Sequence, residues 1–259
     1  MQTERLLMFS IIIPVYKSYT LLKRCLNSLV QQNPRLFEVI IVDDTPPKYR
    51  QIIDLKEYRF SHKVVANYKN RGVTFSRNRG YFLARNKYCV FLDSDDTLTP
   101  NSLSYLLEMI DLHKPQIILS RCSDIYGNIV GSRMDSTISN SVSVLVDTYG
   151  KGERLVVVKK CSYKPFISSL RGHEFAGLLR YIDRNSASNV ISVDLNKVTR
   201  CYHDDNINSI SAGKYLHSRF KLIMKGHLVS VIYLCKFGRY FNSLKFFLRY
   251  LIYFFRIRS

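Results

Sequence analysis

Residues 9–44 read FSIIIPVYKSYTLLKRCLNSLVQQNPRLFEVIIVDD, and this stretch decides the fold. Its first apolar run, Phe9 to Val15, is rich in isoleucine and has the length of a strand buried on both faces. A helix should follow, because apolar side chains recur at helical spacing until Asn33 and Pro34 end the pattern. These side chains are Leu21, Leu22, Cys25, Leu26, Leu29 and Val30. Residues 37–44 then form a second buried strand, so the stretch predicts a βαβ unit.

The same alternation continues to residue 119. Val64–Ala66 and Cys89–Leu92 have the composition of short strands, and a helical pattern that ends at Ala84 lies between them. Pro100 opens another helix, and Gln116–Leu119 form a further strand. Repeated alternation of this kind predicts an α/β fold, with an open, mostly parallel twisted sheet and helices on both faces.

The pattern is less regular after Ser120. Tyr126, Gly127 and Asn128 suggest a turn. We expect strands at Val142–Val146 and Leu155–Val158, and a helix at Phe175–Tyr181. The sequence from Lys214 to Ser259 has a helical pattern.

The chain is strongly basic. It has 39 Lys and Arg against 20 Asp and Glu, a formal net charge of +19. This excess predicts an anionic partner, such as nucleic acid, lipid headgroups or a phosphorylated substrate. No acidic residue occurs from Asn206 to Ser259, so the C-terminal tail is the most basic segment.

The tail has the pattern of an amphipathic helix. Its apolar side carries Phe241, Leu244, Phe247, Leu248, Leu251 and Phe255. Its polar side carries Asn242, Lys245, Arg249 and Arg256. Basic residues interrupt the apolar runs too often for a membrane span, so we expect the helix to lie on a membrane surface. The alternative is that it packs on the rest of the protein or on a partner chain.

The six cysteines are scattered without a CxxC pair, which indicates neither a zinc site nor a disulfide framework. A reducing compartment fits this pattern. The N-terminal apolar run ends at Pro14 and is too short for a signal peptide or a membrane span. We therefore expect a cytoplasmic protein.

Polar residues follow three of the expected strands. The first strand ends in PVYK (14–17), the second in Asp43 and Asp44, and the third in DSDD (93–96). In an open α/β sheet, ligands bind outside the carboxyl ends of the strands. These three segments therefore point to one binding crevice.

The DSDD segment places three carboxylates within four residues. Such a group needs a cation or many hydrogen-bond donors to offset its repulsion. Carboxylate oxygens suit Mg²⁺ or Mn²⁺, which usually keep some water and share their coordination with substrate phosphates. The alternative is that Asp96 or Thr97 caps the helix that begins near Pro100.

Four segments in this order resemble the family 2 glycosyltransferases of GT-A fold. They are FSIIIPVYK (9–17), EVIIVDDTP (38–46), NRGVTFSRNRGYFLA (70–84) and YCVFLDSDDTLTP (88–100). The resemblance covers Phe9 to Glu108. One departure is Lys17, where the family often has Asn.

The resemblance implies a role for each matched residue. The nucleotide base would be held near Pro14, Val15 and Tyr16, and by Asp44. Arg77 would lie near the diphosphate. The nucleotide-sugar site would include Asp93 and Ser94, and the metal ligands would be Asp93 and Asp95. Without such a role, Arg77 and Arg79 would form a solvated helix face.

The second half resembles the family through RGHEFAGLLRYI (171–182) and VTRCYHDDNINSIS (198–211). The resemblance makes Glu174 the catalytic base, which takes a proton from the acceptor hydroxyl during inversion. His203 would complete the metal coordination or contact the diphosphate, although a structural histidine is the alternative. His173 has the same two interpretations, and Asp204 and Asp205 are expected to be loop acids.

The family resemblance implies an inverting glycosyltransferase that uses Mn²⁺ or Mg²⁺. It would move a sugar from a nucleotide diphosphate, by family tendency UDP, to a glycan or lipid-linked acceptor in surface polysaccharide synthesis. Residues 1–119 would bind the nucleotide sugar, residues 120–212 the acceptor, and residues 213–259 would form the basic tail on the inner face of the cell membrane.

Two other functions remain open. A nucleic-acid-binding protein would explain the charge and the 18 tyrosines. It would not explain DSDD, whose carboxylates would repel a polyanion, so we do not expect nucleic acid as a partner. A nucleotide-binding scaffold without turnover would keep the fold, and His173 in place of the usual acid makes it conceivable.

Overall fold

The structure, a computed structural model, describes residues 8–131, 137–139, 142–148, 152–170, 173–185, 190–193, 197–205 and 216–258. The strands are β1 Phe9–Val15, β2 Phe37–Asp43, β3 Ser61–Ala66, β4 Tyr88–Phe91, β5 Thr97–Leu98, β6 Ile117–Ser123, β7 Thr137–Ser139, β8 Arg154–Lys159, β9 Val190–Val193 and β10 Arg200–Cys201. The α-helices are α1 Tyr19–Val30, α2 Val73–Leu83, α3 Ser102–His113, α4 Ser143–Thr148, α5 Glu174–Asn185, α6 Leu216–Lys236 and α7 Tyr240–Arg258. A short 3-10 helix, Pro47–Tyr49, follows β2.

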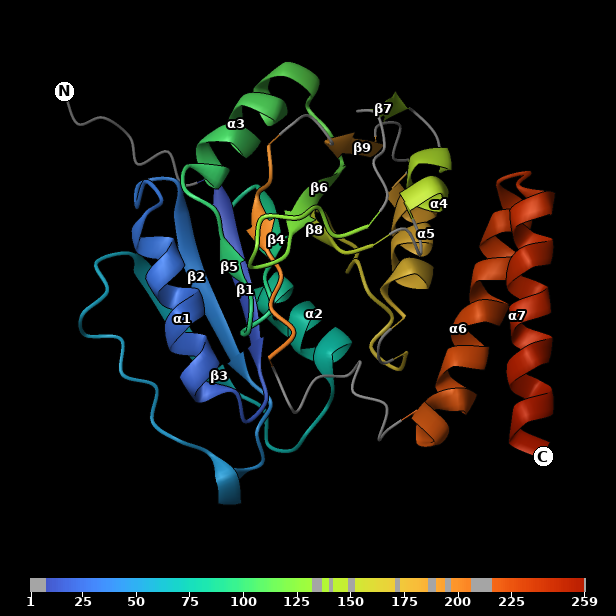
Figure 1. The fold of residues 1–259 in the computed structure, drawn as a ribbon, viewed down its shortest axis with the longest axis horizontal. Coiled ribbons are helices and arrows are strands. Elements are labelled where there is room, and N and C mark those ends of the chain that lie inside the picture. Colours follow the sequence, from blue (N-terminus) through green and yellow to red (C-terminus); the bar gives the residue numbers. More distant parts are fainter. Residues whose placement is uncertain are drawn as a thin grey trace.

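The sheet has the strand order β3-β2-β1-β4-β8-β6-β10-β5 (Figure 1). Strands β1 to β4 pair in parallel, with Phe9 opposite Phe37 and Val15 opposite Asp43. Beyond them, β8 runs antiparallel to both β4 and β6. The predicted parallel βαβ arrangement is therefore confirmed for the first four strands, and their carboxyl ends lie at one edge.

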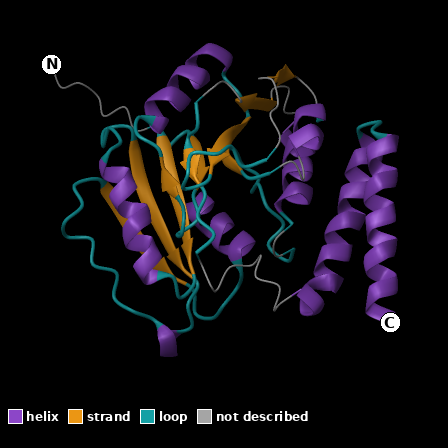
Figure 2. Cartoon of the chain, viewed as in Figure 1, coloured by secondary structure: helices purple, strands orange, loops and turns teal. Residues whose placement is uncertain are grey.

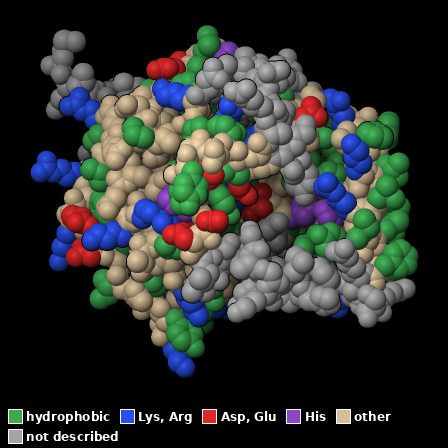
Figure 3. All heavy atoms as spheres, in the orientation of Figure 1, with side chains coloured by type: hydrophobic (Ala, Val, Ile, Leu, Met, Phe, Trp, Pro, Cys, Tyr) green, Lys and Arg blue, Asp and Glu red, His purple; other side chains and the backbone are tan. Residues whose placement is uncertain are grey.

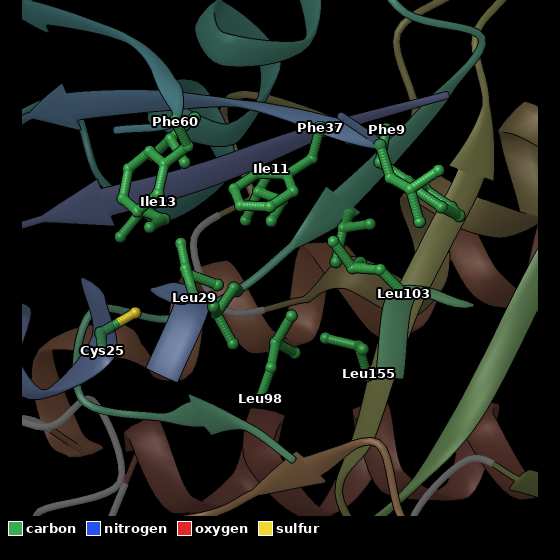
Figure 4. Close-up of a cluster of buried hydrophobic side chains, with 14 of the residues drawn as sticks. Phe9, Ile11, Ile13, Cys25, Leu29, Phe37, Phe60, Leu98, Leu103 and Leu155 are labelled. Atoms are coloured by element: carbon green, nitrogen blue, oxygen red, sulfur yellow. The ribbon is translucent and has the colours of Figure 1, made fainter. Parts of the chain in front are cut away.

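Helices cover both faces of the sheet (Figure 2). Strand β1 lies between β2 and β4 in the sheet. Its alternate side chains point to opposite faces and pack in two different cores. Ile11 and Ile13 pack with residues of α1 and α3 (Figure 4), whereas Ile12 packs with residues of α2 and α5. Gly80 permits this close approach, because a Cβ there would lie 2.4 Å from Cγ2 of Ile12. The continuous apolar run of β1 thus reflects burial on both faces.

One prediction of local structure was wrong, and one alternative interpretation of the DSDD segment does not hold. The segment Val142–Val146 was expected to be a strand, but α4 occupies it and buries Val144 and Leu145 on one side. Its β-branched residues indicated a strand, and tertiary packing overrides that weak preference. Thr97 does not cap a helix either, because it lies in β5, which pairs with β10, and α3 begins only at Ser102.

The basic tail forms a helical hairpin rather than one helix. Gly238 has φ +68°, a conformation that suits glycine, and its N–H donates to the carbonyl of Cys235. Helix α6 packs on α5, and α7 lies beside α6 at the end of the molecule away from β3 (Figure 1). Phe246 of α7 stacks on Phe175 of α5 with ring centroids 5.0 Å apart. None of the helices in the described ranges is long and apolar enough to cross a bilayer.

Candidate active site

The candidate site lies where the parallel strands end. Acidic side chains gather near the middle of the face in Figure 3. Val15 ends β1 and is buried, and Tyr16 beyond it is 37% exposed. Pro14 lies within β1 opposite Val42, so the PVY segment reaches the same edge as Asp44.

Asp44 is buried and heavily hydrogen-bonded. Its Oδ1 accepts from Nδ2 of Asn67 at 2.7 Å and from the backbone N–H of Arg71 at 2.8 Å. Its Oδ2 accepts from the backbone N–H of Gly72 at 2.6 Å. Gly72, with φ +86°, gives the chain the turn that starts α2. Asp44 therefore fixes the loop before α2 to the end of β2.

Arg77 joins two carboxylates from different parts of the chain. Its guanidinium lies 2.6 Å from Oδ1 of Asp93 and 3.0 Å from Oε1 of Glu174. Asp93 follows β4, and Glu174 is the first residue of α5. The structure thus brings together three of the residues singled out in the sequence, which are separated by up to 97 positions.

The two carboxylates differ in their proton affinity. Burial raises the pKa of Glu174, and the charge of Arg77 offsets only part of this effect. Burial acts in the same direction on Asp93, but the charges of Arg77 and Arg200 outweigh it and hold the pKa of that carboxyl below its ordinary value. Two carboxylates with separated pKa values can carry different roles, one remaining an anion and the other exchanging a proton.

A second buried pair supports the DSDD segment. Oδ2 of Asp96 lies 3.3 Å from Nη1 of Arg200, and these side chains are 2% and 4% exposed. Oδ1 of Asp96 accepts from the backbone N–H of His203 at 3.1 Å. Nε2 of His203 lies 3.3 Å from Oγ1 of Thr97. His203 is therefore held against the loop that carries the strand-end acids.

The other two DSDD residues are also anchored. Oγ of Ser94 lies 2.7 Å from Oγ of Ser18. The carbonyl of Asp95 accepts from Nη2 of Arg24 at 2.7 Å, and Arg24 also forms two hydrogen bonds with Asp205. Asp205 was expected to be only a loop acid, but it fixes Arg24 against the DSDD segment.

His173 lies in the packing between α5 and α6. Its Nε2 is 3.3 Å from Nδ1 of His227, and a Cβ at Gly226 would collide with its ring. Burial lowers the pKa of His173 to about 4 and that of His227 to about 4, so both rings are neutral near pH 7. The structural interpretation of His173 therefore fits the contacts better than a site role.

Comparison with known proteins identifies the family. A profile of glycosyl transferase family 2 matches residues 10–171, more than half of the chain. The chain belongs to glycosyl transferase family 2. The residues matched include the three strand ends of the candidate site.

Two relatives show how much of this family 2 chain is similar to known proteins. An uncharacterized glycosyltransferase of Haemophilus influenzae is 38% identical over 104 residues, which are 40% of this chain and 35% of that protein. The poly(ribitol-phosphate) beta-N-acetylglucosaminyltransferase TarS of Staphylococcus aureus is 29% identical over 147 residues, which are 53% of this chain and 25% of TarS. The chain thus matches only about a quarter to a third of the length of these relatives.

The fold of this family 2 chain matches a solved structure. The crystal structure of S. aureus TarS 1–349 in complex with UDP-GlcNAc superposes with a TM-score of 0.68 at 19% sequence identity. The match covers 86% of this chain and 66% of that one. The predicted GT-A type α/β fold is confirmed.

Asp93 and Asp95 carry carboxylate oxygens, the type of ligand that Mg²⁺ and Mn²⁺ prefer. Within the described residues, no group of three or more His, Cys, Asp or Glu side chains could hold a metal by itself. The predicted set of Asp93, Asp95 and His203 does not form such a cage. Two carboxylates are nevertheless enough for Mg²⁺, which commonly uses one or two together with water and phosphate oxygens.

The sequence alone did not reveal Arg200 or Arg24 as part of the site. Arg200 stands in the matched string at 198–211, but nothing in that string indicates a partner 104 positions earlier. Arg24 lies in the helical pattern after β1, where it would be expected to face solvent. The signal that could have found them is the charge of DSDD, because buried carboxylates require cationic or hydrogen-bonding partners.

Proposed function

We propose that this chain is an inverting, metal-dependent glycosyltransferase that moves a sugar from a UDP-sugar to a glycan or lipid-linked acceptor in surface polysaccharide synthesis. The observation that supports this best is the pair of contacts from Arg77 to Asp93 and Glu174. They bring the strand-end acid and the candidate base within reach of one side chain. The TarS fragment, which shares the fold, has been crystallised with UDP and with UDP-GlcNAc, and this favours a uridine donor.

In the proposed reaction, Glu174 accepts the proton of the acceptor hydroxyl. The oxygen of that hydroxyl attacks the anomeric carbon from the side opposite the diphosphate, and the bond from this carbon to the diphosphate oxygen breaks. One displacement inverts the configuration at the anomeric carbon. The raised pKa of Glu174 makes it a stronger base than an exposed carboxylate. Arg77 would hold Glu174 in place before the acceptor arrives.

Asp44 could still bind a nucleotide base although it already has three donors. A carboxylate offers about four acceptor positions, and Asn67, Arg71 and Gly72 occupy three of them. The remaining position on Oδ2 could accept an N–H of uracil. The three existing bonds would fix its direction.

Asp93 and Asp95 would hold the divalent cation, with His203 as an additional ligand or a contact of the diphosphate. When bound, the cation would neutralise the charge that develops on the leaving diphosphate. The backbone of Asp95 is fixed by Arg24, which limits the movement of this loop. Arg77 would supply further positive charge beside Asp93.

Calorimetric titration with UDP, GDP and CDP, each with and without Mn²⁺, tests the donor site. We expect one nucleotide to bind more tightly with Mn²⁺, and the Asp95→Ala variant to lose this gain, on the order of tenfold in affinity. Asp111→Ala is the matched control, because Asp111 is an exposed residue on α3. It should bind like the wild type.

Other outcomes would favour the alternative functions. Nucleotide binding without sugar transfer to any acceptor would favour a scaffold. Absence of nucleotide binding, together with salt-sensitive binding to oligonucleotides, would favour a nucleic-acid-binding protein. Equal Mn²⁺ dependence in the wild type and the Asp95→Ala variant would contradict the metal assignment.

We also propose that the α6–α7 hairpin lies on the inner face of the cell membrane. One side of α7 packs on α6, but the opposite side keeps apolar residues exposed, along the edge occupied by hydrophobic side chains in Figure 3. Phe241 is 69% exposed, Leu248 50% and Phe255 64%. Lys245 and Arg249 flank this apolar side, and basic residues near an anionic leaflet contribute about 1 kcal/mol each.

Sedimentation with vesicles of phosphatidylglycerol and phosphatidylcholine tests this surface. The double variant Phe241→Ser/Leu248→Ser should bind at least about tenfold more weakly, because each buried side chain contributes about 1.5–3 kcal/mol. Ile52→Ser is the matched control, since Ile52 is 95% exposed on a loop far along the chain from the hairpin. If the double variant binds as the wild type does, the hairpin does not contact the membrane.

A further inference from the structure

A pocket of about 460 Å³ lies between α2, α5 and the loop that follows β8. Its lining consists of Asn78, Tyr81, Phe82, Lys160, Cys161, Ser162, Tyr163, Lys164, Arg180 and Arg184. The volume is within the range of small-molecule sites in proteins. Three of the lining residues are aromatic, and two of them are exposed, Phe82 at 82% and Tyr163 at 44%.

This pocket is separate from the candidate active site. Lys160 follows the end of β8, where Lys159 pairs with Tyr88 at the start of β4. Asp93 lies beyond the opposite end of β4. Arg180 is six residues after Glu174 along α5, about 9 Å at the usual helical rise. The pocket therefore opens at the opposite edge of these strands.

The lining of the pocket is positively charged. Four of its ten lining residues are cationic, and none is acidic. Lys160 and Arg180 donate only to backbone carbonyls, including Phe166 at 2.8 Å, and Arg184 lies over the ring of Tyr163 at 5.5 Å. Within the described residues, no carboxylate forms an ion pair with any of the four.

Two of these cations also repel each other. Arg180 and Arg184 are four positions apart on α5, so they lie on the same side of the helix. Burial and the charge of Arg184 lower the pKa of Arg180. The nearby acid Asp183 is 2.7 Å from Lys236 and is therefore already paired. A bound anion would offset the repulsion that the protein itself leaves in place.

We infer that this pocket binds a phosphorylated sugar. Guanidinium groups bind phosphate through paired hydrogen bonds, and Arg180 and Arg184 with Lys160 and Lys164 could surround one phosphate group. The pocket is much larger than a phosphate ion and leaves room for a further group. The exposed ring of Phe82 suits the C–H face of a sugar ring, and Ser162 could bind its hydroxyls.

Cys161 provides a local readout of occupancy. Its side chain lines the pocket and is partly exposed, whereas Cys235 is exposed on α6 outside it. The rate at which iodoacetamide alkylates each cysteine can be followed by peptide mass spectrometry. A site with a Kd of about 1 mM would be about nine-tenths filled by about 10 mM glucose 1-phosphate, so alkylation of Cys161 should slow by about tenfold. Cys235 should react as before.

Two variants and two comparison compounds test whether protection of Cys161 requires the cationic pocket and a phosphorylated sugar. Arg184→Glu should remove the protection of Cys161, whereas the exposed Arg35→Glu on another surface should not. Glucose should give no protection. Equal protection by inorganic phosphate would overturn the sugar part of the inference, and no protection by glucose 1-phosphate would overturn it altogether. The result does not depend on the proposed catalysis, because nucleotide binding and transfer are measured separately.

Discussion

The Glu174→Gln variant should bind the nucleotide as tightly as the wild type and lose sugar transfer by at least about a hundredfold. The amide has nearly the shape of the carboxylate and can still interact with Arg77. It cannot accept the proton of the acceptor hydroxyl at any pH near neutrality. The measurement is kcat for transfer to a working acceptor, with nucleotide affinity by calorimetry on the same preparations. The loss should appear in kcat, because the carboxylate of Glu174 accepts the proton in the transition state.

The pH dependence of transfer gives this prediction a second test. Burial raises the pKa of Glu174, and the base works only when it is deprotonated. The wild-type rate should therefore fall as the pH is lowered through that raised pKa. The residual activity of the Glu174→Gln variant should lack this acidic decline.

A matched control separates this role from a general effect of removing a charge. Glu57→Gln removes an exposed carboxylate outside the site and should leave kcat unchanged. Transfer by Glu174→Gln at the wild-type rate would refute the base assignment. Loss of nucleotide binding in that variant would mean that Glu174 supports the donor site through Arg77 instead.

The parallel half of the fold was predictable because its elements are defined locally. Strands β1 and β2 are continuous apolar runs, and burial on both faces requires such runs. The apolar spacing of α1 predicted its length to within two residues at the start. Segments of this kind can be recognised from their own residues. The order of strands and helices then predicted the sheet edge at which the candidate site lies.

The second half was harder because its elements depend on distant partners. Strand β10 has only two residues, and it exists through pairing with β5, about 100 positions earlier, and with β6, about 80 positions earlier. No local pattern marks such a strand. The same reason explains why α4 was predicted to be a strand. Its valines favour a strand locally, and packing against the rest of the protein determines the helix.

The site was predicted through residue types and not through their contacts. Asp93, Arg77 and Glu174 were singled out separately, and the structure joins them in one cluster. The three donors to Asp44 and the Arg200 partner of Asp96 were not predicted. Each of these contacts joins residues that are distant in the sequence and meet only in the folded chain. Acidic motifs therefore indicate the candidate site, whereas the buried cations that pair with them are identified only from the fold.

The Arg200→Met variant should lose about 3–5 kcal/mol of unfolding free energy at pH 8. Arg200 is 4% exposed, and its partner Asp96 is 2% exposed, so the variant leaves a carboxylate buried beside Asp93 and Asp95 without its counter-charge. Arg24→Met is the matched control. Arg24 and Asp205 are 33% and 49% exposed, and breaking such an exposed pair costs only about 0–1 kcal/mol. Urea denaturation of the three proteins measures the differences.

The loss of unfolding free energy in Arg200→Met should be smaller at low pH. Burial, with Asp93 and Asp95 nearby, raises the pKa of Asp96 to about 7 even in the presence of Arg200. A carboxyl with a raised pKa takes up a proton on folding, so its contribution to stability is present at low pH and is lost as the pH rises through the folded pKa. Removing Arg200 raises that pKa further. The variant should therefore be nearer to the wild type at pH 6 than at pH 8, and equal losses at both would mean that Asp96 is not the group left uncompensated.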